Sequence, residues 1–190
     1  MTRKLSAKPK IEEAALRLFA SEGVSGASMR RIAAEAGITE PAVYRHFANK
    51  EELVARVFEE RYRQFGQELA DVAAGADEAE FRSRLAAMVR AACRIHDRDP
   101  GVFRFLLTSQ HDSLPRMIPG FTPVDVVARE IEEAVSEGEC PAQDPNVATA
   151  IVFGIVLQTA TFLSYGRVSG SMEDHAARLS KACVAALESV

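Results

Sequence analysis

Apolar residues recur every three or four positions along almost the whole chain, which is the spacing of one face of an α-helix. Residues that favour the beginning or the end of a helix punctuate this pattern at intervals. Together they predict an all-α fold of about nine helices. We expect these helices at about 9–22, 28–37, 39–47, 49–71, 81–99, 100–112, 122–138, 144–166 and 171–190.

Two short helices joined by a tight glycine turn are predicted between Ser28 and Lys50. The Ser28 hydroxyl can accept a hydrogen bond from a free backbone N–H of the first helix, and Gly37 can adopt the left-handed conformation that ends it. Thr39 is expected to cap the second helix, which keeps six side chains away from the core: Glu40, Pro41, Ala42, Tyr44, Arg45 and His46. An exposed face of this kind is what enters the major groove of DNA.

Charge is distributed unevenly between this stretch and the remainder. The net charge of −4 would by itself argue against nucleic-acid binding, yet residues 1–50 carry nine Lys and Arg against five Glu, a net charge of +4. Residues 51–190 carry fourteen against twenty-two acidic residues, a net charge of −8. Four of the basic residues form an N-terminal arm that could follow phosphates: Arg3, Lys4, Lys8 and Lys10.

The N-terminal residues resemble the DNA-binding domain of the TetR (tetracycline-repressor) family of transcriptional regulators. The likeness runs from about residue 10 to 58 and rests on IEEAALRLFASEG and GITEPAVYRHFANKEEL. It implies an N-terminal three-helix helix-turn-helix domain joined to a helical ligand-binding and dimerisation domain. On this basis we expect a DNA-binding domain at 1–50, a connecting helix at 51–75 and an effector-binding and dimerisation domain at 76–190. The expected function is repression from a palindromic double-stranded DNA operator by a homodimer that a small-molecule effector releases.

Roles within the DNA-binding stretch follow from side-chain chemistry. Glu40, Pro41, Ala42 and Arg45 are candidates for base contacts, because carboxylate, guanidinium and small apolar groups match cytosine, guanine and thymine edges. Ser28 and Thr39 are placed for phosphate contacts, and the family resemblance adds Tyr44, His46 and Lys50. Arg30 and Arg31 are further candidates, with solvated helix-face arginines as an equally open alternative.

The last two predicted helices carry unusual apolar patterns. Residues 144–166 are apolar nearly all round the helix, which requires cover on two sides. Residues 171–190 show alternating four- and three-residue steps of small and apolar residues, the spacing of a helix-packing seam. A dimer through a four-helix bundle would use both, and packing of the last helix within its own chain is the alternative. The candidate interface residues are Ile155, Thr159, Phe162, Met172, Leu179, Cys183 and Ala186.

Residues able to line an effector cavity occur in the C-terminal part, although each could equally be ordinary core. The candidates are Met88, His96, Phe103, Phe121, Phe153 and Gln158. They do not identify a ligand.

Other functions have weaker support in the sequence. The His96-Asp97 and His111-Asp112 pairs faintly resemble metal-dependent HD-type phosphohydrolases, but a metal site needs further converging ligands, and helix-terminal histidines are the simpler interpretation. A helical adaptor would leave the charge asymmetry unexplained. We therefore expect no enzyme activity, no cofactor and no metal. The three distant cysteines suit a reducing cytoplasm, and the interrupted apolar run at 147–163 predicts a buried helix rather than a membrane span.

Overall fold

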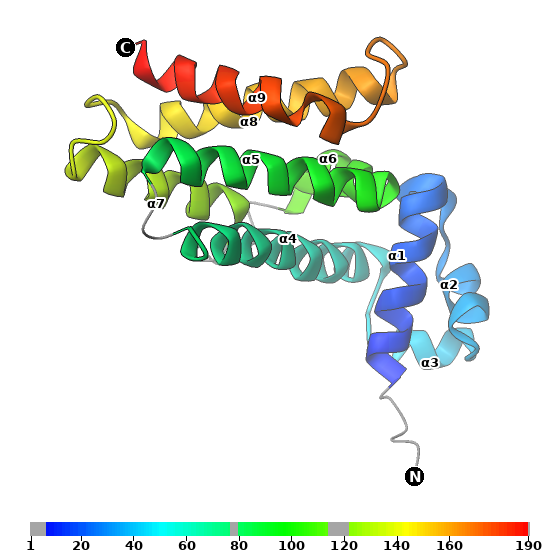
Figure 1. Cartoon of the computed structure of the whole chain (residues 1–190). Helices are drawn as coiled ribbons and strands as arrows, with labels where there is room; N and C mark the ends of the chain where they lie inside the picture. The colour runs from blue at the N-terminus through cyan, green and yellow to red at the C-terminus, as the bar shows by residue number, and fades with distance from the viewer. Residues whose placement is uncertain (1–6, 77–79, 114–121, 190) are drawn as a thin grey trace. The chain divides into compact units, whose positions relative to one another are not determined.

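Nine α-helices make up the part of the chain that the computed structural model describes, residues 7–76, 80–113 and 122–189, and this part contains no strand (Figure 1). The predicted all-α fold is confirmed. The helices are α1 (Ala7–Gly26), α2 (Met29–Ala36), α3 (Glu40–Tyr44), α4 (Lys50–Ala74), α5 (Phe81–Arg98), α6 (Pro100–Ser113), α7 (Pro123–Ser136), α8 (Pro145–Ser164) and α9 (Met172–Glu188).

The helix boundaries follow the capping signals in the sequence at most ends. Ser28 accepts from the backbone N–H of Arg31, and reciprocal capping boxes join Thr122 to Asp125 and Ser171 to Asp174. Thr39 precedes α3 as its N-cap residue, but its side chain makes no capping hydrogen bond, so that part of the prediction is wrong. The first helix resumes after a break at Gly23, whose φ is 78°, and continues to Gly26.

The chain divides into two compact units, and α6 belongs with the N-terminal one. Unit 1 comprises residues 1–62 and 99–118, and unit 2 comprises 63–98 and 119–190. Within unit 1, α6 packs on α1 because Gly101 permits close approach: a Cβ there would lie 2.8 Å from the carbonyl oxygen of Ala20. Phe105 also stacks on Phe19, with ring centroids 5.4 Å apart. These contacts separate α6 from the 76–190 segment in which the sequence analysis placed it.

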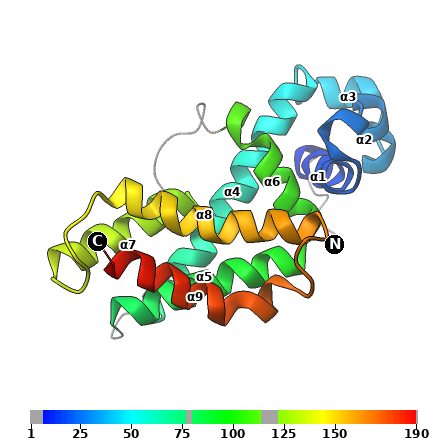
Figure 2. The same ribbon diagram turned by 90° about the horizontal axis from the view of Figure 1, so that it is seen from above.

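Unit 2 is built around α5. Helix α9 packs mainly on α5, and α8 lies beside both α7 and α9 (Figures 1 and 2). Buried Arg84 links α5 to α7 and to the residues that follow α7. Its guanidinium donates hydrogen bonds to Glu130 of α7 at 3.2 Å and to Glu139 at 3.1 Å. The Glu139 carboxylate also accepts from the backbone N–H of Phe81, 3.0 Å away, at the start of α5.

The predicted seam of α9 faces into its own chain. Met172 and Cys183 are fully buried and Leu179 is 6% exposed, because this face packs on α5. These three residues are therefore removed from the predicted dimer interface, and the alternative of intramolecular packing holds for this face of α9. Ala186 lies half-buried on the same helix.

Burial also sets the chemistry of the cysteines. Cys93, Cys140 and Cys183 are all free and buried. Burial raises the pKa of the Cys93 thiol to about 11 and that of Cys183 to about 12. Both thiols are therefore protonated near neutral pH, in the form that reacts poorly with oxidants.

Helix α8 has an exposed apolar face as well as a buried one. By length and composition it could cross a membrane, with a mean hydropathy of 1.9 over an 18-residue window that is 28% buried. Val152, Val156 and Ala160 lie inside unit 2, whereas Val147, Phe162 and Tyr165 are 57%, 44% and 72% exposed. The sequence predicts that α8 packs against other residues on two sides. In the structure one side is buried in unit 2, and the other exposes apolar side chains.

Asp97 caps α9 from the end of α5, over a separation of 75 residues. Its carboxylate accepts from the backbone N–H groups of Met172 at 3.0 Å and Glu173 at 2.8 Å, and lies 2.8 Å from Nδ1 of His96. Burial alone raises the pKa of Asp97, but the hydrogen bonds from His96, Glu173 and Met172 outweigh it and hold this pKa below its ordinary value. The ionised cap also complements the positive end of the α9 dipole.

Asp97 should make unit 2 sensitive to acid. A carboxyl group with a lowered folded-state pKa stabilises the fold above its unfolded pKa of about 4, and this contribution is lost as the pH falls through the folded value. We expect the free energy of unfolding of the wild type to fall more steeply than that of Asp97→Asn between about pH 5 and pH 3. Urea denaturation followed by circular dichroism at several pH values measures this, and parallel pH profiles would contradict the assigned role.

Candidate nucleic-acid interface

A short left-handed turn fixes α2 against α3 in unit 1. Gly37 adopts φ 67° and ψ 34°, and its N–H donates back to the end of α2. The N–H of Ile38 then donates to the carbonyl of Ala33 at 3.0 Å. Ala33 is buried, and its small side chain leaves room for α3 to pack on α2. The turn at Gly37 and the small side chain of Ala33 thus form the predicted helix-turn-helix.

Helix α3 ends at Tyr44, three residues before the predicted end. Together with the turn that follows, it keeps an apolar face inward and a polar face outward. Val43 and Phe47, one turn apart, are buried in the core of unit 1. Tyr44 is 49% exposed, and Arg45 and His46 are exposed beside it. None of the ten predicted DNA-binding residues is buried: Ser28, Arg30, Thr39, Pro41, Tyr44, Arg45 and His46 are exposed, and Glu40, Ala42 and Lys50 are half-buried. Their roles toward DNA stay predictions.

Ion pairs join α2 to α1, and one of them involves Arg31. Arg31 forms a two-pronged pair with Glu22, in which one nitrogen lies 2.6 Å from Oε1, and it also donates to the carbonyl of Gly26. Hydrogen bonding to Arg31 keeps the pKa of Glu22 below its ordinary value. Arg17 of α1 similarly donates to Glu35 of α2 at 2.9 Å. Both Arg30 and Arg31 are exposed, but the guanidinium of Arg31 is engaged by Glu22 and Gly26 within unit 1.

Lys50 has a structural role that the sequence analysis missed. Its Nζ donates to the carbonyl oxygens of Val24 at 3.1 Å, in the last turn of α1, and of Ala27 at 3.2 Å, between α1 and α2. An ammonium group has three donors, so one direction remains for a phosphate oxygen. The two acceptors lie 23 and 26 residues away, and no local sequence signal indicates them.

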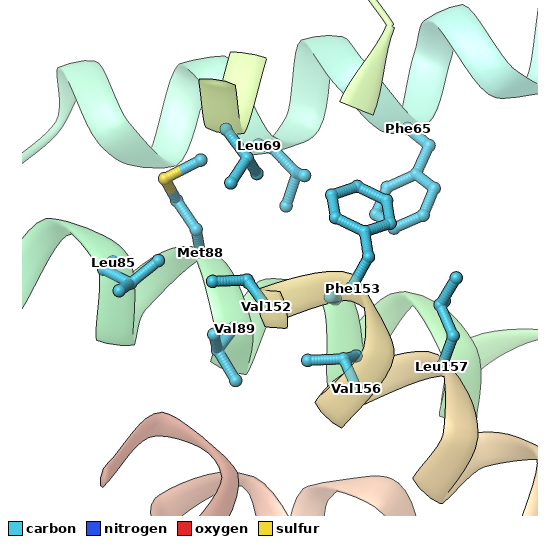
Figure 3. Close-up of a pocket in the computed structure, with 11 residues that line it drawn as sticks. Phe65, Leu69, Leu85, Met88, Val89, Val152, Phe153, Val156 and Leu157 are labelled. Carbon is cyan, nitrogen blue, oxygen red and sulfur yellow. The ribbon is translucent and has the colours of Figure 1, made fainter. Parts of the chain in front are cut away.

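Unit 2 contains an apolar cavity enclosed by α4, α5, α7 and α8 (Figure 3). The free volume of this cavity is about 30 Å³. Its wall consists of Phe65, Leu69, Leu85, Met88, Val89, Ala92, Val127, Val152, Phe153, Val156 and Leu157. Met88 and Phe153 were among the predicted cavity residues, and the other nine were not singled out.

The remaining predicted effector residues lie elsewhere. Phe103 is buried in unit 1, because α6 packs on α1, so it is removed from the cavity of unit 2. His96 pairs with Asp97, and Gln158 is exposed on α8, so neither lines the cavity wall. Phe121 falls outside the described residues.

Of the two His-Asp pairs, the structure describes the side chains of His96 and Asp97. Asp97 is engaged at the start of α9, and the side chains of His111 and Asp112 fall outside the description. Over the ranges that are described, no group of three or more His, Cys, Asp and Glu side chains is placed to hold a metal ion.

The two-helix turn on a three-helix core defines unit 1 as a helix-turn-helix domain of the type found in bacterial regulators. Residues 11–57 match the family "Bacterial regulatory proteins, tetR family". The regulator AcrR of Shigella flexneri is 45% identical over 49 residues, covering 26% of this chain and 23% of that protein. The A-factor receptor protein of Streptomyces griseus is 30% identical over 148 residues, covering 75% of this chain and 49% of that protein. Residues 11–57 therefore form a DNA-binding domain of the TetR family.

The fold of the whole chain matches solved structures as well. The regulator FadR of Bacillus subtilis, solved in complex with stearoyl-CoA, aligns with a TM-score of 0.73 at 16% identity over 93% of this chain and 97% of that one. At this identity the likeness concerns the fold. The segments matched in three curated relatives span between 23% and 49% of the length of those proteins.

Proposed function

We propose that this protein is a DNA-binding transcriptional regulator, a repressor that binds a palindromic operator as a homodimer. The observation that carries the proposal is the surface formed by α3 and the turn after it, where Tyr44, Arg45 and His46 are exposed and Val43 and Phe47 are buried on the opposite side. A recognition helix in the major groove needs such a division between its two faces. This function places the protein in the cytoplasm, where its DNA is.

Selection from random duplex DNA tests the proposal directly. The purified chain should enrich a sequence with two related half-sites separated by about one helical turn, or about 10 base pairs. Arg45→Ala should weaken binding to the selected site and relax the preference at one position of each half-site, as expected for a base contact. Recovery of no enriched sequence would contradict the proposed function.

Lys50 is predicted to contribute a phosphate contact in addition to its ties to Val24 and Ala27. Lys50→Ala should weaken selected and unrelated duplexes alike and reduce the slope of log affinity against log salt concentration by about one unit. Anisotropy titrations at several salt concentrations measure the slope. Arg90→Ala removes an exposed arginine of unit 2 and serves as the charge control. An unchanged slope in Lys50→Ala would leave Lys50 with its structural role alone.

The homodimer is proposed to form through the exposed face of α8. Val147, Ile151, Ile155, Phe162 and Tyr165 fall on one stripe at helical spacing, with Thr159 at its margin. Large exposed apolar side chains on one stripe favour a subunit interface. The stripe retains Ile155, Thr159 and Phe162 from the sequence prediction, and half-buried Ala186 stays a candidate beside them.

A small-molecule effector is proposed to bind in the cavity of unit 2. Met88 and Phe153 contribute to a wall without charged groups, which favours a ligand with an apolar part. The fold relative from Bacillus subtilis was solved with stearoyl-CoA, a ligand with an apolar chain. Since the free volume of the cavity is small, about 30 Å³, an effector would bind a wider form of unit 2. Selecting that form would release the operator if the wider form binds DNA poorly.

A further inference from the structure

One buried hydroxyl group in unit 2 lacks a hydrogen-bond partner. Thr149 of α8 is 3% exposed, and its Oγ1 makes no hydrogen bond within the described residues. The hydroxyl groups of two other threonines of the same helix donate hydrogen bonds to backbone carbonyls four residues earlier. Thr159 donates to the carbonyl of Ile155 at 2.8 Å and Thr161 to that of Leu157 at 2.9 Å. A buried hydroxyl without a partner is costly, which calls for an explanation at Thr149.

Thr149 lies on the stripe of α8 that forms the cavity wall. At 100° per residue it falls between Val152 and Phe153 in angle and almost directly in line with Val156, and all three line the cavity. It sits about one turn, or about 5 Å along the helix, before the first of them. The unpaired hydroxyl is therefore next to the end of the cavity that is nearest the start of α8.

The residues that line the cavity supply no side chain that forms a hydrogen bond, because all of them are Phe, Leu, Met, Val or Ala. A charged group entering the cavity would lose its hydration without gaining a compensating partner, which is unfavourable. An uncharged polar group reaching Thr149 would instead gain a hydrogen bond and pair the buried hydroxyl. The cavity wall thus favours a ligand that is mostly hydrocarbon, and Thr149 favours a ligand that carries one neutral polar group.

We propose that the effector is an uncharged molecule, mostly hydrocarbon, whose single hydroxyl or carbonyl group hydrogen-bonds to Thr149 while its hydrocarbon part widens and fills the cavity. The proposal rests on the proposed effector-binding function of unit 2 and adds the chemical class of the ligand. It also assigns to Thr149 the specificity for that class.

Calorimetric titration with 1-octanol and with octanoate at pH 7 tests this on the whole 190-residue chain. The wild type should bind 1-octanol, and octanoate at least tenfold more weakly. Thr149→Val, which removes the hydroxyl at nearly constant shape, should weaken 1-octanol about 3- to 10-fold, the effect of one neutral hydrogen bond. Thr149→Ser should retain the wild-type affinity. Thr161→Val, which removes an internally bonded hydroxyl of the same helix, is the matched control and should bind 1-octanol as the wild type does.

Melting temperatures check the premise that the hydroxyl is unpaired in the ligand-free protein. Thr149→Val should melt at or above the wild-type temperature, because no hydrogen bond is lost. A lower melting temperature for Thr149→Val would show an internal bond and overturn the proposal. Equal 1-octanol affinity in the wild type and Thr149→Val, octanoate binding as tight as that of 1-octanol, or no binding of 1-octanol would overturn it too.

Operator binding by the same ligand-free preparation separates this inference from the proposed function. Failure of 1-octanol to bind while the selected operator is still bound overturns only the assignment of the ligand class. Loss of operator binding in the ligand-free wild type would count against the regulator itself, whatever the calorimetry shows.

Discussion

Phe162→Glu is expected to convert the protein from a dimer to a monomer and to lower its affinity for the selected operator at least about a hundredfold. Phe162 is 44% exposed in the last turn of α8, on the apolar stripe between Ile155 and Tyr165. In a two-fold interface each substitution occurs twice, so two carboxylates would be buried against apolar side chains without partners. A monomer contacts one half-site only and loses the gain from linking two contacts.

Sedimentation velocity over a range of protein concentrations measures the oligomeric state, and anisotropy with labelled operator measures the affinity. Val124→Glu is the matched control, because Val124 is also an exposed apolar residue, 37% accessible, but belongs to α7. It should remain dimeric with the wild-type affinity. A Phe162→Glu protein that still sediments as a dimer would locate the interface elsewhere, and a monomer with full operator affinity would contradict the need for two reading domains.

The features that sequence reasoning predicted are those encoded within a few residues. Ser28 and Gly37 bound α2 as expected, because a cap and a left-handed glycine act on the adjacent turn. The capping boxes at Thr122 and Ser171 are of the same kind. In each case the side chain and the backbone group it satisfies are at most three residues apart, so no knowledge of the tertiary fold is needed.

The errors concern partners that are distant in sequence. The spacing of Met172, Leu179 and Cys183 predicts that α9 packs through this face, but not whether the partner is α5 or another subunit. Phe103 packs in unit 1 and not in the cavity, because α6 lies against α1. The residues of α1 are about 80 positions earlier in the chain, so the sequence near Phe103 does not indicate them. The carboxylate of Asp97 meets α9 over a similar gap. The spacing of apolar residues indicates that one face of a helix is buried. Only the folded structure identifies the element that packs against that face.

Arg84 shows how burial decides the value of an ion pair, and Arg82 on the same helix provides the comparison. The Arg84 side chain is 11% exposed and joins α5 to Glu130 and Glu139, which are 18% and 32% exposed. The Arg82 side chain is 61% exposed and pairs with Glu188 of α9. Both arginines have carboxylate partners, so a count of salt bridges would rank them alike.

Arg84→Ala should lower the free energy of unfolding by about 3 kcal/mol, because removing one member of a buried pair leaves the other charges without compensation. Arg82→Ala should cost less than about 1 kcal/mol, since solvent screens the exposed pair. Urea denaturation at pH 7, followed by circular dichroism, measures both. Equal effects of the two substitutions would contradict the argument from burial. Adding Glu130→Gln to Arg84→Ala should restore part of the loss, because that change removes one of the stranded carboxylates and leaves the fold otherwise intact.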